Sequence, residues 1–287
     1  LMKKLITLVM VAAATAVYGQ DRSQHRNLHN MITIDSCKVQ VDYLFYHTRD
    51  TTAKQSVFDR HRLDIGKSVT HYYSYNAFRV DSIMHRATTD INPHKHMQRD
   101  EKIYCEDVFT NYPRAGVRQT LTGIINTDYL REEPIPELHW RLSEERKSVA
   151  GYSCRRATTE FRGRKWIAWF AEEIPAMSGP WKLAGLPGLI LEAEDSEGLF
   201  EWRAVAIRRG DEAPMGIYNR KHIENKTVPV SRKQLAHLQE LQWKDYADLY
   251  IRHGMKISIM DPKTQTIRRL KSGEYPPRPY IPPLELE

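Results

Sequence analysis

Two runs of alternating apolar and polar residues, separated by a short turn, constrain the fold of this chain more than any other feature. In residues 189–195, Leu189, Leu191 and Ala193 fall on one side of an extended strand, while Glu192 and Glu194 fall on the other. Residues 199–207 alternate in the same way, and Ser196 to Gly198 supply the turn. We therefore expect an antiparallel hairpin with one face on a core and the other in water.

Further extended runs fill the chain up to its last quarter. They are rich in strand-forming residues and cover residues 40–46, 64–75, 102–111, 116–125, 137–142, 149–161 and 166–171. Gly163 suits the positive φ of a tight hairpin between the last two runs. Because short turns rather than crossovers join the runs, we expect an antiparallel sheet and a mainly β, α+β fold. A short helix is expected over residues 74–86.

The clearest helix signal covers residues 231–253. Ser231 and Gln234 form a capping box, and Gly254 stands where a left-handed C-cap belongs. The apolar residues of this segment fall on one broad face, so the helix should pack on the sheet. The proline-rich tail, residues 275–287, is expected to be extended along the surface.

The N-terminus has the layout of a cleavable signal peptide. Lys3 and Lys4 precede an apolar run, and small residues lead to an expected cut after Gly19. We expect residues 1–19 to be removed and residues 20–287 to form one domain, with a core over about 40–260. The sequence has no second apolar run long enough for a membrane span. We therefore expect a periplasmic or secreted protein.

The formal net charge is +7, but the basic residues are scattered along the chain. Pairs such as Arg155/Arg156 and Arg162/Arg164 are interpreted as solvated strand edges and turns, and no nucleic acid is expected as a partner. The three cysteines, Cys37, Cys105 and Cys154, allow at most one intramolecular disulfide, whose pairing stays open. Buried thiols are an equal alternative.

Residues 151–195 resemble the signature block of the GLPGLI family of Bacteroidetes envelope proteins, named after the hexapeptide Gly185 to Ile190. The terminal run Tyr280 to Glu285 is similar to the usual ending of that family. The resemblance implies a secreted β-rich protein of unknown role, often associated with TonB-dependent transport systems. Its layout is similar to open-barrel lipoprotein carriers, which implies a sheet curved into an open or half barrel with the C-terminal helix packed on it.

Motifs for catalysis are missing from the sequence. It has no GxSxG, HExxH or phosphate-binding GxxxxGK[ST] pattern, and its neighbouring carboxylates would point apart on a strand. We expect no enzymatic activity and no cofactor. His94 and His96, followed by Met97, form the one local candidate for copper or zinc, although two histidines make at most half a site.

The leading hypothesis is a hydrophobic ligand or peptide bound in the curved sheet. Tryptophans near the signature block are the candidate lining, since concave apolar sites use such side chains: Trp140, Trp166, Trp169, Trp181 and Trp202. The alternative is that they fill the core. A different class of function is an accessory protein that docks on an outer-membrane receptor or transporter through an edge strand or the tail.

The stretch Gly185-Leu186-Pro187-Gly188 leaves two interpretations open. Glycine and proline at a strand entry suit a kinked crossover that turns the chain sharply into the sheet. The same bare backbone would also suit a ligand or a partner lying against it, so these four residues are candidate ligand-binding positions.

Overall fold

The computed structural model describes residues 31–51, 55–86, 97, 101–125, 127–209, 212–218, 226–260, 264–275, 278 and 280–286. Their elements run, in chain order, as β1 (Met31–Ser36), β2 (Val39–Asp50), β3 (Gln55–Ile65), β4 (Thr70–Ser74), α2 (Tyr75–Arg86), β5 (Glu106–Thr110), β6 (Val117–Ile124), β7 (Thr127–Pro134), β8 (Arg141–Val149), β9 (Tyr152–Phe161), β10 (Arg164–Ala171), β11 (Leu189–Asp195), β12 (Phe200–Arg209), β13 (Pro214–Tyr218), β14 (Lys226–Pro229), α3 (Arg232–Lys244), α4 (Tyr246–Arg252), β15 (Ser258–Met260) and β16 (Ile267–Arg269).

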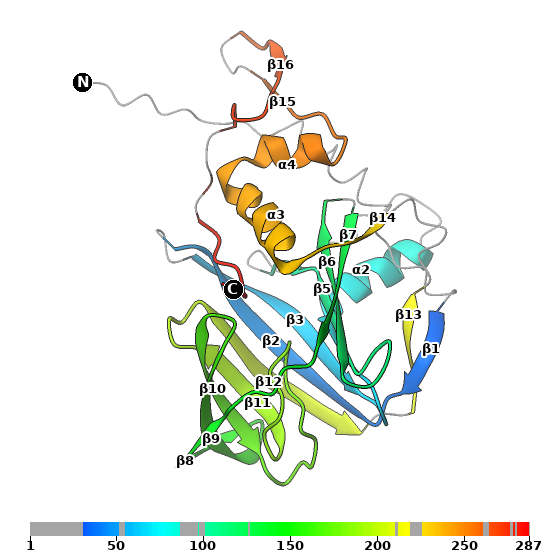
Figure 1. Ribbon diagram of the computed structural model, residues 1–287, viewed down its shortest axis with the longest axis vertical. Helices are drawn as coiled ribbons and strands as arrows, with labels where there is room; N and C mark the ends of the chain where they lie inside the picture. Colours follow the sequence, from blue (N-terminus) through cyan, green and yellow to red (C-terminus); the bar gives the residue numbers. More distant parts are fainter. Residues whose placement is uncertain are drawn as a thin grey trace, which may run out of the picture.

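One sheet of 12 strands organises the molecule, in the order β14-β7-β6-β5-β4-β3-β2-β12-β11-β10-β9-β8. Its pairs are antiparallel except β14 with β7, which is parallel. Figure 1 shows the long strands β2 and β3 between the group β4–β7 and the group β8–β11. Among the described strands the two ends of the sheet do not pair, so the sheet stays open. The predicted mainly β, open-sheet fold is confirmed.

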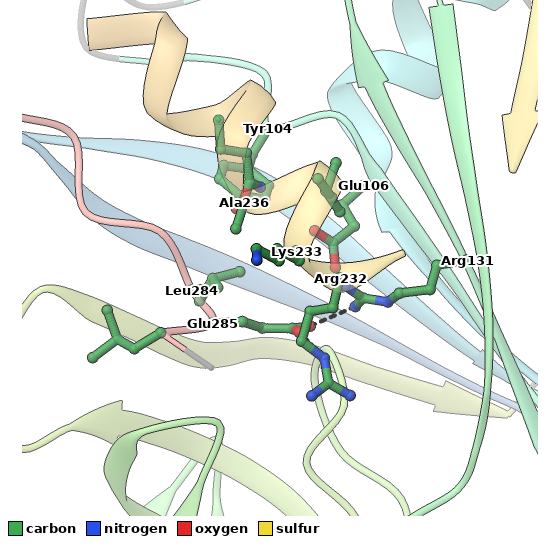
Figure 2. Close-up of a pocket in the computed structure, with 11 residues that line it drawn as sticks. Tyr104, Glu106, Arg131, Arg232, Lys233, Ala236, Leu284 and Glu285 are labelled. Carbon is green, nitrogen blue, oxygen red and sulfur yellow. Dashed lines mark hydrogen bonds and ion pairs between the residues drawn. The ribbon is translucent and has the colours of Figure 1, made fainter. Parts of the chain in front are cut away.

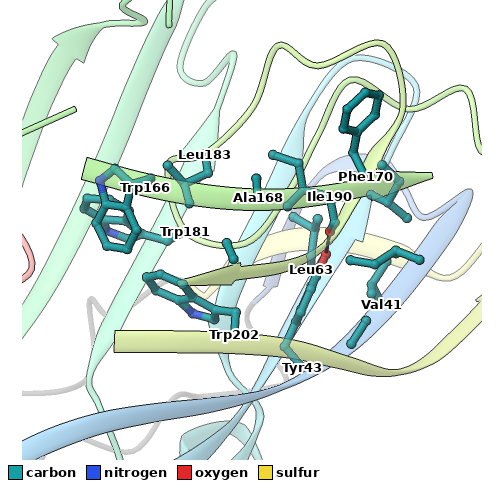
Figure 3. Packing of buried hydrophobic residues seen from close by; sticks show 14 of the residues in the cluster. Val41, Tyr43, Leu63, Trp166, Ala168, Phe170, Trp181, Leu183, Ile190 and Trp202 are labelled. Atoms are coloured by element: carbon teal, nitrogen blue, oxygen red, sulfur yellow. Dashed lines mark hydrogen bonds between the residues drawn. The ribbon is translucent and has the colours of Figure 1, made fainter. Parts of the chain in front are cut away.

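The main core lies between two parts of the protein. One is the region of the sheet formed by β2 and β9–β12, and the other is the segment that precedes β11. The buried side chains of this core include Tyr43, Trp166, Leu183, Ile190 and Trp202 (Figure 3). Among the described helices, none combines the length and the apolar character that a membrane span requires.

A second, smaller core joins the helices to the sheet. Leu235 and Leu241 of α3 and Leu249 of α4 are buried together with Ile124 and Tyr129 of the sheet. The predicted packing of the C-terminal helix on the sheet is thereby confirmed.

The predicted hairpin lies where its pattern placed it. The first strand, β11, has the predicted bounds, and Ala193 pairs with Trp202 of β12. The tight turn between β9 and β10 has positive φ at Arg162 (55°) and Gly163 (73°), as a two-residue hairpin turn requires.

The expectation that one face of β11 meets water is wrong. Ile190 is 0% exposed and Glu192 is 8% exposed, although both belong to the face expected in water. The chain before β11 covers this face: Ser178 O accepts a hydrogen bond from Ile190 N, and a Cβ on Gly179 would lie 2.7 Å from the Ile190 Cβ. A glycine is therefore needed where the covering segment crosses the strand.

Several strand predictions had wrong bounds, and two of these differences have a local cause. The run 64–75 is divided, because a turn closed by Gly66 N and Val69 O (2.9 Å) ends β3 before β4 begins. Residues 135–140 carry no regular structure, although 137–142 were expected to be a strand. Pro134 and Pro136 cannot donate to a strand ladder, so pairing resumes only at β8.

The single helix predicted over 231–253 is two helices. The capping box of Ser231 and Gln234 is present at the start of α3, as expected. Asp245 interrupts the segment with φ −149°, and its side chain accepts a hydrogen bond from Asp248 N at 3.0 Å. The aspartate ends α3 and caps α4, which redirects the chain.

Candidate functional site

Three of the candidate tryptophans lie in the main core. Trp166, Trp181 and Trp202 form a triangle of rings with centroids 5.6–6.0 Å apart, and each is at most 3% exposed (Figure 3). Their indole N–H groups are all bonded: Trp166 to Phe161 O at 3.0 Å, Trp202 to the Tyr72 hydroxyl at 2.6 Å and Trp181 to a Glu106 carboxylate oxygen at 3.0 Å. These contacts correspond to the core-filling alternative.

The other two candidate tryptophans are partly buried. Trp140 donates a hydrogen bond from Nε1 to Ala184 O at 2.9 Å, next to the signature hexapeptide. The Lys147 ammonium lies 4.3 Å from the centre of the Trp169 ring, a cation–π contact. The structure therefore does not gather the five tryptophans around one cavity.

The signature hexapeptide packs against its own chain. A Cβ on Gly188 would lie 2.3 Å from Ala171 O, and Leu186 is 1% exposed. Gly185 has φ +93°, which favours glycine. The bare backbone at Gly188 thus faces β10, and Pro187 lies between the two glycines, as expected for the kinked crossover.

The cysteines and the histidines add no site among the described residues. Cys37, Cys105 and Cys154 are thiols rather than a disulfide pair, and burial raises the pKa of Cys154 to about 11. His94 and His96 lie outside the described residues. The described part of the chain contains no group of three or more His, Cys, Asp or Glu side chains placed to hold a metal ion.

A largely buried charge cluster, which the sequence did not indicate, lies beside α3. It brings together residues of β5, β6, β7, the β9–β10 turn, the segment before β11, α3 and the C-terminus: Glu106, Arg118, Arg131, Glu133, Arg162, Lys182, Arg232 and Glu285. Arg162, interpreted from sequence as a solvated turn residue, is 15% exposed here. Arg164 is 2% exposed and pairs with Asp195 at 2.8 Å, so that interpretation is wrong for both arginines.

Lys182 is the centre of this charge cluster. Its side chain is 0% exposed, and its ammonium contacts Glu133 Oε1 at 3.3 Å and also donates to Glu285 Oε1. Arg131 Nη2 donates to the same Glu285 oxygen at 2.7 Å. The lysine is thus compensated by two carboxylates from β7 and from the C-terminus, as a buried cation requires.

Two further arginines close the charge cluster. Arg162 Nη2 and Arg232 Nη2 donate to Glu133 Oε2 at 2.6 and 3.2 Å. Their Nε atoms each lie 3.7 Å from Glu285 Oε2, which is an ion pair but too long for a hydrogen bond. Glu133 and Glu285 therefore share cations from four separate parts of the chain.

The carboxyl groups of the charge cluster titrate differently because their surroundings differ. Burial alone raises the pKa of Glu133, but Lys182, Arg131 and Arg162 outweigh it and lower this pKa to about 2. The pKa of Glu285 is also lowered, since Lys182 and Arg131 outweigh its burial. For Glu106 burial prevails and raises the pKa. Its carboxyl group is the one most inclined to be neutral.

The C-terminal segment, residues 280–286, is anchored rather than loosely apposed. Leu284 is 3% exposed, and Leu286 N donates to Arg162 O at 3.0 Å. Arg164 donates to Pro283 O at 2.7 Å and to Leu284 O at 3.2 Å. These bonds hold Glu285 inside the charge cluster.

A cavity of about 380 Å³, here called the tail pocket, lies between the C-terminal segment and α3 (Figure 2). Figure 2 shows Arg131 reaching from β7 to Glu285, with Glu106 above them and Arg232 in front. The lining combines apolar and charged side chains: Tyr104, Glu106, Arg131, Arg232, Lys233, Leu235, Ala236, Gln239, Leu284, Glu285 and Leu286. Its size and mixed lining are those of a small-molecule site.

Comparisons with known proteins leave the activity open. No curated protein matches this sequence. The structure of PNGF-II is similar with a TM-score of 0.46 and 11% identity over 79% of this chain, and the chain spans 35% of the PNGF-II length. An uncharacterized conserved protein from Thermus thermophilus has a TM-score of 0.32 and 9% identity over 77% of this chain and 99% of its own. At these scores neither likeness assigns a fold or a function.

Residues 162–192 contain the β9–β10 turn, β10 and the hexapeptide Gly185 to Ile190. This segment matches the model of a family described as "Protein of unknown function (Porph_ging)".

Proposed function

We propose that this protein is a non-enzymatic protein of the bacterial envelope that binds a small, largely hydrophobic ligand in the tail pocket. The single observation that carries the proposal is a cavity of about 380 Å³ in which four apolar residues, Leu235, Ala236, Leu284 and Leu286, lie beside charged and polar side chains. The curved sheet is the weaker location, because the tryptophan rings there contact one another and their N–H groups are bonded.

The proposal includes a periplasmic location and membership of the GLPGLI family. The basic start and apolar run of residues 1–19 favour export. The family match over residues 162–192 includes the hexapeptide Gly185 to Ile190, which favours the membership.

The test is to purify the protein from its native host and release bound compounds by denaturing mass spectrometry. A stoichiometric compound is expected from the wild type. Ala236→Trp should abolish it, because Ala236 lines the tail pocket and the indole would fill the cavity. His237→Trp is the matched control, since His237 is the next residue of α3, its side chain is 55% exposed and it does not line the pocket.

Two results would contradict the proposal. A wild-type protein without any bound compound, but cross-linked in the host to an outer-membrane receptor, would favour docking on a transport system. Equal retention of the compound by Ala236→Trp would place the ligand elsewhere.

A further inference from the structure

The tail pocket and the charge cluster behind it carry more positive than negative charge. Six cationic side chains belong to them: Arg118, Arg131, Arg162, Lys182, Arg232 and Lys233. The carboxyl groups with a lowered pKa are Glu133 and Glu285, while burial raises the pKa of Glu106. The six cations face three carboxyl groups, those of Glu106, Glu133 and Glu285, and this excess of positive charge favours an anion at this place.

Hydrogen-bond donors without acceptors accompany this excess charge. Arg131 is 6% exposed and lines the tail pocket, yet its Nε has no partner among the described residues. Arg118 is 1% exposed, and its Nε and Nη1 are likewise unsatisfied within the part of the chain that the structure describes. Burial lowers the pKa of Arg118 to about 10, so it remains charged at neutral pH. Buried donors without acceptors are rare in folded proteins, so these donors favour a ligand that carries acceptor atoms.

Apolar side chains border the same cavity. Leu235 of α3 lies on one wall, and Leu284 and Leu286 of the C-terminal segment lie on another. Glu285, between these two leucines, accepts hydrogen bonds from Arg131 and Lys182. The C-terminal segment thus provides an example of how this part of the protein binds a carboxylate that has apolar groups next to it.

We infer that the ligand of the tail pocket is an aliphatic carboxylate, whose acidic group accepts hydrogen bonds from Arg131 and Arg232 while its apolar chain lies against Leu235, Leu284 and Leu286. This inference rests on the proposed function and names the ligand class. Free fatty acids and acylated amino acids share this chemistry, and the compound released from the host protein identifies the source.

Isothermal titration calorimetry of the full chain with three probes of equal chain length tests the inference. The probes are decanoate, decanol and decyltrimethylammonium, each below its micellar or solubility limit. Decanoate should bind at least about tenfold more tightly than decanol, the ratio expected from one charge-assisted hydrogen bond. Decyltrimethylammonium should bind more weakly than both, because the cations repel it.

Arg232→Gln tests the contribution of the ligand's acidic group to the affinity separately from that of its apolar chain. The side chain of Arg232 is 39% exposed at the first turn of α3, so folding should persist and be verified by an unchanged decanol affinity. The variant should lose about tenfold in decanoate affinity. Lys244→Gln, at the other end of α3 and 53% exposed, is the control that should bind all probes like the wild type.

The outcomes distinguish this inference from the proposed function. Equal affinities for decanoate and decanol, or an Arg232→Gln variant with unchanged preference, would overturn the acidic ligand but leave a hydrophobic pocket. A released host compound without an acidic group would do the same. Failure of both decanoate and decanol to bind, together with a host protein that holds no compound, would overturn both.

Discussion

Glu133→Gln should reduce the acid sensitivity of this fold. The substitution keeps the shape of the side chain but deletes the charge that Lys182, Arg131 and Arg162 stabilise. Glu133 has a pKa of about 2 in the folded protein and an ordinary value of 4.5, which we take for the unfolded chain. Because the folded pKa is the lower one, its contribution to stability is fully present above pH 4.5 and is lost as the pH falls toward 2.

The size of this contribution follows from the two pKa values. At 1.36 kcal/mol for each unit, the difference between 4.5 and about 2 corresponds to about 3 kcal/mol of unfolding free energy. We expect Glu133 to contribute about 2 kcal/mol to the unfolding free energy. The value is lower because Arg232, which also pairs with Glu133, is 39% exposed and solvent screens part of the attraction. More than half of it should be lost by pH 3.

Urea unfolding followed by tryptophan fluorescence at pH 6 and pH 3 measures this contribution. At pH 6, Glu133→Gln should be about 3 kcal/mol less stable than the wild type, since it leaves buried cations uncompensated. Its further loss between pH 6 and pH 3 should be smaller than that of the wild type by about 1–2 kcal/mol. Glu160→Gln, which breaks an exposed pair with Lys165, should follow the wild type. An equal loss in Glu133→Gln and wild type would refute the reasoning.

Two further substitutions test the local reasoning by urea unfolding. Gly188→Ala should lower the free energy of unfolding by at least about 3 kcal/mol, because the new Cβ would lie 2.3 Å from the Ala171 carbonyl oxygen. Gly198→Ala, also at positive φ but in open space, should lower it by about 1 kcal/mol. Equal losses would show that the close approach is unimportant. Ser231→Ala should lower the free energy of unfolding by about 1 kcal/mol, because it removes the oxygen that accepts a hydrogen bond from Gln234 N at the start of α3. An unchanged urea midpoint would contradict the role of the cap.

Local patterns predicted many of the elements, but they missed β1, β7 and β13 to β16, and several predicted limits were wrong. The bounds of β11 and the capping box of α3 were correct because alternation, turn residues and caps act over a few neighbouring positions. The break at Asp245 was missed, because an aspartate within an apolar helical pattern also suits an exposed helix position. Only the hydrogen bond to Asp248 N shows that it caps a new helix.

The candidate site was predicted much less well than the fold. The tryptophans were candidate ligand-lining residues with core filling as the alternative, and Trp166 and Trp202 pack against each other in the core. Whether such a residue fills a core or lines a cavity depends on which segments cover it. The sequence carries no local signal for that.

The sequence alone determined the β-rich class, the hairpin at residues 189–207 and the helix starting after Ser231, because each depends on residues that are neighbours in the chain. Only the tertiary structure decided that β11 is covered on both faces and that Glu285 joins Lys182 and Arg131 across separations of 103 and 154 residues. Charge compensation acts over a few ångströms in space, and sequence periodicity does not indicate which distant charges will meet.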